Sequence, residues 1–473
     1  MNDRADIVVV GGGPGGTAAA LEAARHGASV ILLEADERIG GNAARSTGYL
    51  AFQDFAMQTE AGISDSVERF MADMDAEIER QQDRYGIVYD RDLARRYAEE
   101  SSDAYRFLIE LGFRFNRFIV RPTQHTTDRM VDVEDNTMFT RLFEVALADA
   151  GVDVRVDTRA GRLLTDGDAV VGVATGAGDI WADKGVVLAA GGYQANPELR
   201  LRYQPASIAD TPYLGTDHDR GDGHLMGQAV GGDLVNMTMI PPLVMVASAL
   251  VEDSIAVNTE GARFHDEAGP YDDRVALLRE QPGRLAWYVF DDRVARQKGQ
   301  LVDEMPEDPA TAPTLEALAD AIGADPAGLV ETVRNWNETV TSGIDRDPAF
   351  GRVIFPDPRI GIVEPPFHAS RMIEGINFPA GGLRITTDTQ VVNVFGEPIP
   401  GLFAVGDCAG GISCAIGLGG VRITGALALG RIAGRTIATD SVSASPAGDP
   451  IGAPALTSTT LPSTKMKIPV IDD

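Results

Sequence analysis

The stretch Asp6-Ile-Val-Val-Val-Gly11-Gly12-Gly13-Pro14-Gly15-Gly16 decides the fold, because an apolar strand runs directly into a glycine-rich turn. Residues 17–26 then read as a helix, and residues 29–33 read as a second strand that ends at Glu34. In this GxGxxG pattern the first glycine makes a tight turn, the second lets the backbone approach a pyrophosphate, and the third lets helix and strand pack closely. A carboxylate at the position of Glu34 accepts hydrogen bonds from a ribose hydroxyl. The stretch therefore predicts a dinucleotide with an unphosphorylated ribose.

The composition is that of a large globular protein, with 473 residues of which 44% are hydrophobic and 23% charged. Seventy acidic residues against 41 basic ones leave a net charge of −29, which disfavours a nucleic-acid partner. No apolar run is long enough to span a bilayer, and the first strand leaves no room for a signal peptide, so we expect a cytoplasmic protein with no membrane partner. No histidine lies beside Cys408 or Cys414, and we expect no metal site.

Two more apolar strands run into glycines further along the chain. One covers residues 184–193 and contains Ala190-Gly191-Gly192, and the other runs from Gly401 to Asp407. A dehydrogenase that uses NAD needs only the first strand and turn, so three such segments favour a different dinucleotide. The loop at residues 38–49 is rich in small and hydroxyl side chains. It is either a bed for a flat ligand or an ordinary surface loop.

Helix signals are clear at three places outside this core. Residues 64–112 read as helical, with Asp65 and Glu68 at the spacing of a capping box. Thr314 and Asp325 are expected N-caps of two later helices. The second of these helices has one apolar face, which is formed by Leu329, Val333, Trp336 and Val340. We expect that face to pack in a core.

Taken together, the motifs resemble the FAD flavoproteins related to succinate dehydrogenase and fumarate reductase, over residues 6–439. Besides the opening fold, the matching pieces include Gly40-Gly41-Asn42, Leu188-Ala-Ala-Gly-Gly192, Thr216-Asp-His-Asp-Arg-Gly221-Asp-Gly, Val257-Asn-x-x-Gly-x-Arg-Phe264, Gly381-Gly382-Leu-Arg, Pro398-Ile-Pro-Gly-Leu-Phe-Ala-Val-Gly-Asp407 and Gly419-Gly420. The resemblance implies an α/β fold, with a Rossmann-like FAD-binding domain of the GR2 type interrupted by an α+β capping domain. We expect the FAD-binding domain at residues 1–235 and 370–440, the cap at 236–369 and a flexible tail at 441–473.

The same resemblance implies one FAD per chain. Respiratory members attach FAD to a histidine shortly after the Gly-Gly pair; residues 41–50 contain none, so we expect noncovalent FAD. Asp407 would bond the ribitol chain, and backbone groups near Arg422 and Ile423 would face the flavin carbonyls from a helix N-terminus. The residues assigned to FAD are Gly11, Gly13, Pro14, Gly15, Gly16, Glu34, Ala35, Gly41, Asn42, Ala43, Ser46, Thr47, Gly48, Ala160, Ala190, Gly191, Asp407, Arg422 and Ile423.

Three polar positions of the fumarate-reducing members are changed in this chain. Phe378 stands in place of a histidine and Gly417 in place of an arginine, and Tyr271 replaces the arginine that donates the proton. A dicarboxylate needs paired cationic partners, so fumarate is not expected as a substrate. The residues assigned to substrate are Phe378, Ile416, Gly417 and Leu418. With the Met-, Val- and Pro-rich run at 237–251 they predict an apolar site.

A tyrosine at position 271 resembles the 3-ketosteroid dehydrogenase branch, although Ala415 stands where that branch has a second tyrosine. The main prediction is an FAD-dependent dehydrogenase that desaturates a small apolar ketone, cyclic or steroid-like, next to its carbonyl; its electron acceptor is not identified. Tyr271 would move the proton, with hydride passing to flavin N5, or is an ordinary loop tyrosine. One alternative is a reductase for a small unsaturated acid, with Arg422, Arg371 or Arg274 binding the carboxylate. Another is a flavin-containing binding protein without turnover.

Overall fold

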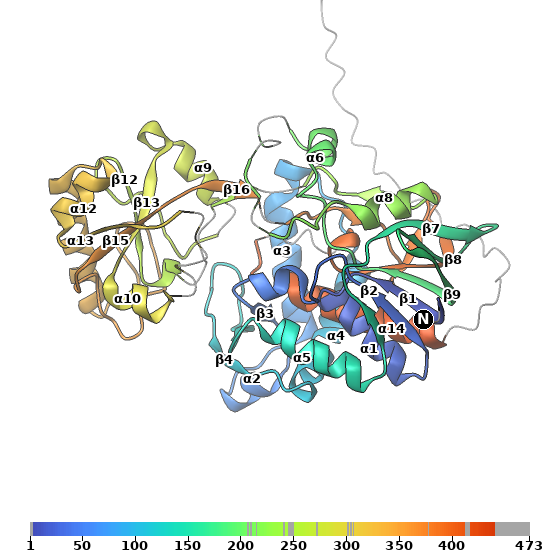
Figure 1. The fold of residues 1–473 in the computed structure, drawn as a ribbon. Helices are drawn as coiled ribbons and strands as arrows, with labels where there is room; N and C mark the ends of the chain where they lie inside the picture. Colours follow the sequence, from blue (N-terminus) through green and yellow to red (C-terminus); the bar gives the residue numbers. More distant parts are fainter. Residues whose placement is uncertain are drawn as a thin grey trace, which may run out of the picture.

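The opening strand, β1 (Arg4–Val10), lies inside the largest sheet of the computed structural model (Figure 1). It pairs in parallel with β2 on one side and β9 on the other, and its last four residues are buried. A strand buried on both faces reads as a continuous apolar run, as this one does. The strand order is β18-β19-β9-β1-β2-β6, and β8 joins β9 to β7. The other strands are β2 (Val30–Leu33), β6 (Asp153–Arg155), β7 (Ala160–Asp166), β8 (Ala169–Thr175), β9 (Gly178–Leu188), β18 (Gln390–Val392) and β19 (Pro398–Ala404). The predicted α/β fold with a parallel sheet is confirmed.

The structure describes residues 3–205, 208, 211–213, 215–239, 242–244, 250–270, 273–299, 302, 305, 307–376, 378–411 and 417–439. Three sequence predictions therefore lie outside the described residues. They concern the proton-transfer role of Tyr271, the substrate contact of Ile416 and the tail at residues 441–473.

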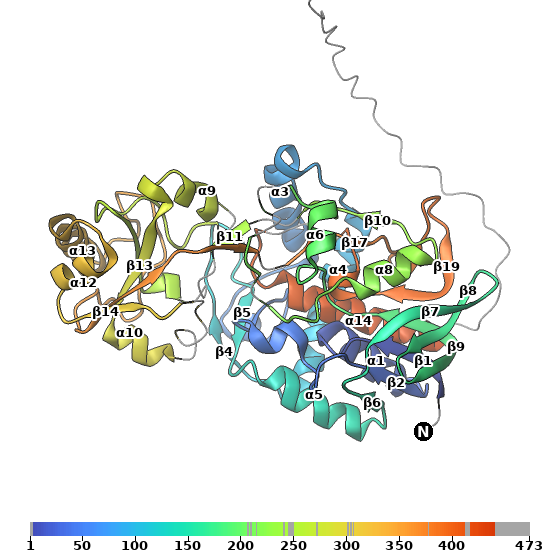
Figure 2. The same ribbon diagram turned by 45° about the horizontal axis from the view of Figure 1, so that its top comes forward.

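The first and last helices of the FAD-binding domain pack directly on each other (Figure 2). They are α1 (Pro14–Arg25) and α14 (Val421–Thr439). A β-carbon at Gly430 would clash with the carbonyl oxygen of Gly15, and one at Gly434 would clash with the carbonyl oxygen of Ala19. Glycine at both positions therefore allows the two backbones to touch, and this contact ties the final helix to the glycine-rich turn.

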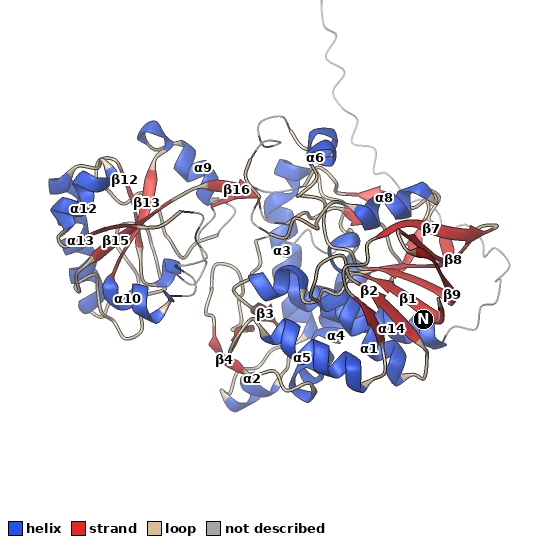
Figure 3. Cartoon of the chain, viewed as in Figure 1, coloured by secondary structure: helices blue, strands red, loops and turns tan. Residues whose placement is uncertain are grey.

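Other helices and a small sheet complete this domain (Figure 3). The small sheet has the strand order β3-β5-β4. Its strands are β3 (Tyr49–Ala51), β4 (Phe115–Phe118) and β5 (Met130–Val133). The helices and 3₁₀ turns are η1 (Gly41–Arg45), α2 (Ala56–Glu60), α3 (Val67–Tyr85), α4 (Arg91–Glu110), α5 (Met138–Asp149), α6 (Pro197–Tyr203), α8 (Asp222–Ala229) and η4 (Gly406–Cys408). Among the described helices, none has both the length and the apolar character needed to cross a membrane.

The helical region predicted at 64–112 is two helices, and its predicted cap is wrong. The chain breaks after α3 at Gly86, which has a left-handed backbone with φ of 59°. The N-cap of α3 is Ser66, whose hydroxyl accepts a hydrogen bond from the amide of Arg69. The carboxylate of Asp65 instead forms an ion pair with the buried guanidinium of Arg129, in which Oδ1 lies 2.8 Å from Nη2. A buried ion pair has displaced the local capping pattern.

The cap is a separate α+β unit, at the left of Figure 1. Its antiparallel sheet has the order β12-β13-β15-β14, and its helices include the two whose N-caps were predicted. Thr314 and Asp325 accept the expected capping bonds, and the apolar face of α13 is buried, so these predictions are confirmed. The elements are η2 (Leu250–Glu252), β12 (Ile255–Asn258), α9 (Arg274–Arg279), η3 (Pro282–Arg284), β13 (Ala286–Asp291), α10 (Asp292–Gln297), β14 (Ala310–Ala312), α12 (Leu315–Ile322), α13 (Pro326–Thr341) and β15 (Phe367–Arg371).

Two short antiparallel ladders mark the passage between the domains. β10 (Leu234–Val235) pairs with β17 (Gly382–Leu383), and β11 (Pro242–Val244) pairs with β16 (Glu374–Ile376). The predicted end of the cap at residue 369 needs correction, because it cuts β15, a strand that pairs with both β13 and β14. The cap sheet continues to Arg371.

Candidate active site

A cavity of about 700 Å³ runs along the carboxyl ends of the parallel strands and continues beneath the cap. Every residue assigned to FAD lines it except Gly16 and Gly48. A β-carbon at Gly16 would clash with the carbonyl oxygen of Gly11, and one at Gly48 would clash with the side chain of Val133. These two glycines therefore serve packing behind the cavity wall, as the turn pattern predicted for Gly16.

The dinucleotide end of the cavity is made of backbone groups and one acid. The carboxylate of Glu34 accepts hydrogen bonds from the amides of Gly12 at 2.7 Å and Asp36 at 2.9 Å, so it is held rigidly at the end of β2. Helix α1 begins immediately after Gly13, and amides in the first turn of a helix have no partner within the helix. A β-carbon at Gly13 would meet nothing within 4 Å. This open cradle at a helix N-terminus fits a pyrophosphate, and Glu34 fits a ribose.

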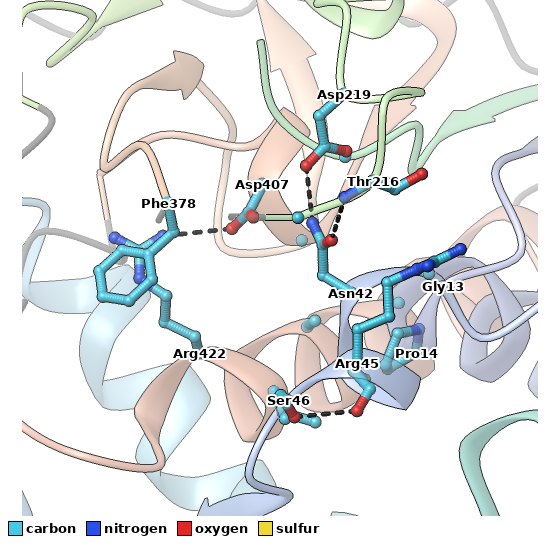
Figure 4. A pocket seen from close by; sticks show the side chains of 18 of the residues that line it. Gly13, Pro14, Asn42, Arg45, Ser46, Thr216, Asp219, Phe378, Asp407 and Arg422 are labelled. Atoms are coloured by element: carbon cyan, nitrogen blue, oxygen red, sulfur yellow. Dashed lines mark hydrogen bonds and ion pairs between the residues drawn. The ribbon is translucent and has the colours of Figure 1, made fainter. Parts of the chain in front are cut away.

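Farther along the cavity, Asp407 and Arg422 form an ion pair of 3.2 Å (Figure 4). Burial raises the pKa of Asp407, and the neighbouring guanidinium opposes that rise. Nη1 of Arg422 also donates to the carbonyl oxygen of Pro379. The guanidinium carbon lies 3.9 Å from the centre of the Phe378 ring, so the ring covers the cation. Ile423, in the first turn of α14, lines the cavity beside this pair.

A hydrogen-bonded network lies between these two ends and joins Asn42, which the sequence assigned to FAD, to three residues that it did not assign. Nδ2 of Asn42 donates to Asp219 at 2.6 Å, and Oδ1 of Asn42 accepts the amide of Thr216 at 3.0 Å (Figure 4). The hydroxyl of Tyr213 donates to the same carboxylate. Burial raises the pKa of Asp219 to about 6. The motif from Thr216 to Gly223 was the available signal, but its spacing does not say which side chain faces the cavity.

At the substrate end, Phe378 and Leu418 line the cavity as expected from the sequence. Gly417 does not line it, which corrects its assignment to substrate. A β-carbon there would clash with the carboxylate of Glu77, so the residue packs against α3. Tyr49, Gln124 and Met130 also line this end. Tyr49 ends the loop at residues 38–49 that the sequence predicted to be either a ligand site or a surface loop, and no sequence motif pointed to the other two. Tyr49 comes from β3, Gln124 from the loop between β4 and β5, and Met130 from β5. The tertiary fold brings these three segments together under the cap.

The structure separates the three arginines proposed to bind a carboxylate. Arg371 does not line the cavity, and its Nε donates to Glu307 at 2.8 Å on the surface of the cap. Arg422 is paired with Asp407. Arg274 lines the cavity and is only 5% exposed. Its Nη2 donates to the carbonyl oxygen of Gly269 at 3.3 Å, and its Nε has no hydrogen-bond partner within the described ranges.

Of the consecutive cap acids Asp266 and Glu267, Asp266 interacts electrostatically with Arg274 without a described ion pair, and Glu267 is already neutralised by two arginines. Glu267 is fully buried and accepts hydrogen bonds from Arg263 at 2.8 Å and from Arg352 at 2.8 Å. Despite the cost of burial, the two guanidinium groups lower the pKa of Glu267 to about 2. Arg274 therefore gains no ion pair from this carboxylate.

The sequence profile of the FAD binding domain family matches residues 6–423. The chain belongs to this family. A probable fumarate reductase Ifc3 from Shewanella frigidimarina is 31% identical over 92% of this chain and 74% of its own length. A urocanate reductase from Eggerthella lenta is also 31% identical, with the same two coverages. The match identifies FAD as the cofactor.

Two solved structures are similar over 92% of this chain. The open conformation of a flavocytochrome c3 fumarate reductase has a TM-score of 0.73 at 29% identity and is covered over 78% of its length. A 3-ketosteroid-Δ4-(5α)-dehydrogenase from Rhodococcus jostii RHA1, in complex with 4-androstene-3,17-dione, has a TM-score of 0.69 at 25% identity and is covered over 97%. The protein is an FAD-dependent oxidoreductase of the fumarate reductase and ketosteroid dehydrogenase family.

Proposed function

We propose that this flavoprotein reduces the C=C bond of a small α,β-unsaturated carboxylic acid. The observation that carries the proposal is the charge balance of the cavity. Six arginines of the described part of the chain line it, and five of them pair with a carboxylate of the protein. The pairs are Arg38 with Glu144, Arg45 with Asp36, Arg121 with Glu252, Arg159 with Asp222 and Arg422 with Asp407. The sixth, Arg274, has no such pair within the described residues.

A buried guanidinium without an anion is expensive, because burial removes its hydration and neutral partners such as the carbonyl oxygen of Gly269 replace only part of it. Such a group is retained where a ligand supplies the missing charge. A carboxylate matches the two parallel N–H groups of arginine, whereas a neutral ketone offers one uncharged oxygen. The charge of Arg274 therefore favours an acid over a ketone as substrate.

Bound FAD supplies hydride exchange with carbon. In the reduction, the β-carbon of the acid gains a hydride and the α-carbon gains a proton, and an external donor supplies the two electrons. Negative charge grows on the carboxylate as the hydride arrives. Arg274, a buried guanidinium in the cavity wall, would stabilise that charge. The source of the proton stays a prediction, because Tyr271 is outside the described residues.

Ketone desaturation is a second candidate. The solved structure with a bound steroid dione supports it, as does the apolar character of part of the cavity wall. The apolar side chains there are Leu243, Val244, Met305, Ile376 and Leu418. The reductase proposal stands first because both reported relatives named for their substrates are reductases of unsaturated acids, and because a ketone leaves Arg274 without an anion.

The decisive experiment compares an acid with its own neutral ester. Enzyme reduced with dithionite under anaerobic conditions is mixed with crotonate or methyl crotonate, and reoxidation of the bound flavin is followed. We expect crotonate to react at least 10²-fold more efficiently. Arg274→Gln should remove most of this advantage by lowering kcat/KM for crotonate about 10²-fold, while leaving the ester within a fewfold.

The matched control is Arg279→Gln, at the other end of α9. Arg279 is an exposed arginine paired with Glu374, so its loss should leave both rates unchanged. FAD content and melting temperature show whether each variant is folded. Equal reactivity of acid and ester, or bleaching of the oxidised enzyme by a saturated cyclic ketone with no reaction of any acid, would replace the reductase proposal with ketone desaturation.

A further inference from the structure

Five carboxylates of the described residues line the cavity, and Asp219 differs from the other four in its partners. Asp36, Asp222 and Asp407 pair with arginines, and Glu34 is held by two backbone amides. Asp219 pairs with no arginine of the described chain, and the two side chains that donate to it are neutral. We infer that Asp219 binds FAD as a neutral carboxylic acid, so that binding of the cofactor near neutral pH takes up one proton onto this residue. The inference concerns the cofactor and does not rest on the proposed function.

Asp219 lies between the pyrophosphate cradle and Asp407, on the wall formed by residues assigned to FAD (Figure 4). Asn42 donates to Oδ2 of Asp219 at 2.6 Å, and the hydroxyl of Tyr213 donates to the same oxygen. The other oxygen, Oδ1, lies so close to Gly191 that a β-carbon there would clash with it. Since Asp219 lines the cavity together with Asn42 and Gly191, its carboxyl group is part of the surface that faces the cofactor.

The hydrogen-bonding capacity of this carboxyl group differs between its two forms. An ionised carboxylate only accepts hydrogen bonds, whereas the neutral acid also donates one. FAD is rich in acceptor oxygens, and its pyrophosphate is anionic. Because Oδ2 already accepts from two donors, a proton on Oδ1 allows Asp219 to donate toward the cofactor. The ionised form would instead repel the pyrophosphate.

Electrostatics favour this proton even before FAD arrives. Burial raises the pKa of Asp219 to about 6, and the charge of Asp407 adds to the rise. The hydrogen bonds from Tyr213 and Asn42 lower this pKa but do not cancel the effect of burial. The cofactor excludes further water and brings negative charge, and each of these changes raises the pKa of a carboxyl group. Asp219 is therefore mostly ionised at about pH 7 without FAD and protonated with FAD, and the proton comes from solvent.

The other ionisable groups packed around Asp219 do not exchange this proton. Burial raises the pKa of the Tyr213 hydroxyl and of the Cys408 thiol, so both stay protonated near neutral pH. Burial also raises the pKa of Asp407, but the guanidinium of Arg422 at 3.2 Å opposes its protonation. Asp219 has no such cation within the described residues and is the carboxyl group left to take up the proton.

His218 needs separate consideration, because an ordinary histidine titrates near neutral pH. It lines the cavity, and its Nδ1 lies 2.9 Å from Nη2 of Arg159. Arginine only donates hydrogen bonds, so this nitrogen accepts and carries no proton. Arg159 is held in turn by its ion pair with Asp222. Protonation of Nδ1 would break the contact with Arg159, which makes His218 the control residue for the experiment.

The test measures how the affinity for FAD depends on pH. Holoenzyme is diluted at a series of pH values from about 5 to about 9, and the fluorescence of released FAD gives Kd. FAD has no group that titrates near neutral pH, so the slope reports the protein. We expect Kd of wild type to be constant below about pH 5.5 and to rise about tenfold per pH unit between about pH 6.5 and about pH 8. A Kd that stays constant up to about pH 8 overturns the inference without any variant.

Two variants assign the proton to a residue. Asp219→Asn keeps an acceptor for Asn42 and Tyr213 but cannot ionise, so its Kd should vary by less than about threefold over the whole range. At about pH 8 its Kd should be at least about tenfold lower than that of wild type. His218→Gln should keep the wild-type slope. A slope that persists in Asp219→Asn, or that disappears in His218→Gln, overturns the inference.

An infrared spectrum detects the proton directly in the holoenzyme. At about pH 8, the difference spectrum between wild type and Asp219→Asn should contain the C=O stretching band of a neutral carboxylic acid, and this band should shift in deuterated water. Bands of an ionised carboxylate in its place would show that Asp219 keeps its charge beside FAD and would overturn the inference. If Asp219→Asn does not fold, Asp219→Ser takes its place in both measurements.

Discussion

The two ends of the cavity are built in different ways. At the dinucleotide end, backbone amides around Gly12 and Gly13 and the rigid carboxylate of Glu34 come from one continuous stretch. At the substrate end, the lining side chains come from segments far apart in the chain, such as Tyr49, Arg274 and Leu418. The first end binds a ligand that is the same throughout the family, and backbone geometry suffices for it. The second must distinguish substrates, and side chains do that.

The two ends also differ in the charge that they leave unbalanced. Asp219, in the network between the dinucleotide end and Asp407, accepts hydrogen bonds from Asn42 and Tyr213 but pairs with no cation within the described residues. Arg274, at the substrate end, pairs with no carboxylate among the residues that the structure describes. Each is a buried charge that the fold tolerates at a cost. Buried charges of this kind lower the stability of the folded protein but can bind a ligand. Substitutions of Asp219 and Arg274 can therefore test the difference between the two ends.

The largest effect expected concerns how the dinucleotide end holds FAD. No histidine stands between Gly41 and Leu50, so all contacts should be noncovalent. Precipitating the protein with acid should release the entire yellow colour into the supernatant. Flavin that remains in the washed pellet would show a covalent bond and contradict this expectation.

A pair of alanine substitutions separates the fold from the cofactor at this end. Gly11 has φ of 107°, and a β-carbon there would clash with the carbonyl oxygen of Ala189, so Gly11→Ala should prevent stable folding. Gly13→Ala meets no protein atom and should leave the FAD-free protein as stable as wild type. It should weaken FAD at least tenfold, because the new methyl group occupies the pyrophosphate cradle. Thermal unfolding measures the stability of each variant, and FAD titration measures its affinity for the cofactor. If the two variants are equally stable and bind FAD equally well, the assignment of Gly11 to packing and of Gly13 to the pyrophosphate is wrong.

At the substrate end, Tyr271→Phe tests the predicted proton transfer. The change keeps the ring and removes only the hydroxyl, so FAD content should not change. If this hydroxyl moves the proton, the rate of flavin oxidation or reduction by the best substrate should fall about 10²-fold or more. Stopped-flow absorbance measures the rate directly. A variant as fast as wild type would make Tyr271 an ordinary loop residue.

Burial of Asp219 without a cation should make the free energy of unfolding depend on pH. Because the folded-state pKa of Asp219, about 6, is above its ordinary value near 4, the folded chain binds more protons between those pH values. Stability contributed by this group is therefore present at low pH and is lost as pH rises through about 6. Asp219→Asn should stabilise FAD-free protein by about 1 to 3 kcal/mol above pH 7 and not at all below about pH 4. The free energy of unfolding of both proteins is measured with denaturant at several pH values. A difference between Asp219→Asn and wild type that does not change with pH would contradict this prediction.

The smallest effect is expected outside both ends. Removing the residues after Asp440 should leave FAD affinity and melting temperature unchanged, because that segment is rich in Ser, Pro and Gly and lacks apolar periodicity. FAD titration and thermal unfolding of the shortened chain measure this. A fall of several degrees would mean that the segment belongs to the fold.

Much of the fold could be predicted where the signal is local. The strand before Gly11, the caps at Thr314 and Asp325 and the apolar face of α13 depend on neighbours within a few residues, and the structure has all of them. The cap predicted at Asp65 failed because Arg129, distant in sequence, competes for the same carboxylate with a stronger charge-assisted bond. The predicted end of the cap at residue 369 was wrong because it falls inside β15, and the amino-acid composition does not change within that strand.

By itself, the sequence determined the cofactor and the backbone site that binds it. A backbone that approaches a pyrophosphate requires glycine at particular spacings, and such spacings can be recognised in the sequence without the structure. It also supplied Arg274 as one of three carboxylate ligands to choose among. Only the tertiary structure decided between them, by placing Glu307 beside Arg371 and Asp407 beside Arg422 and leaving Arg274 buried in the cavity wall. Ion pairing depends on distances between segments that the chain brings together only when it folds.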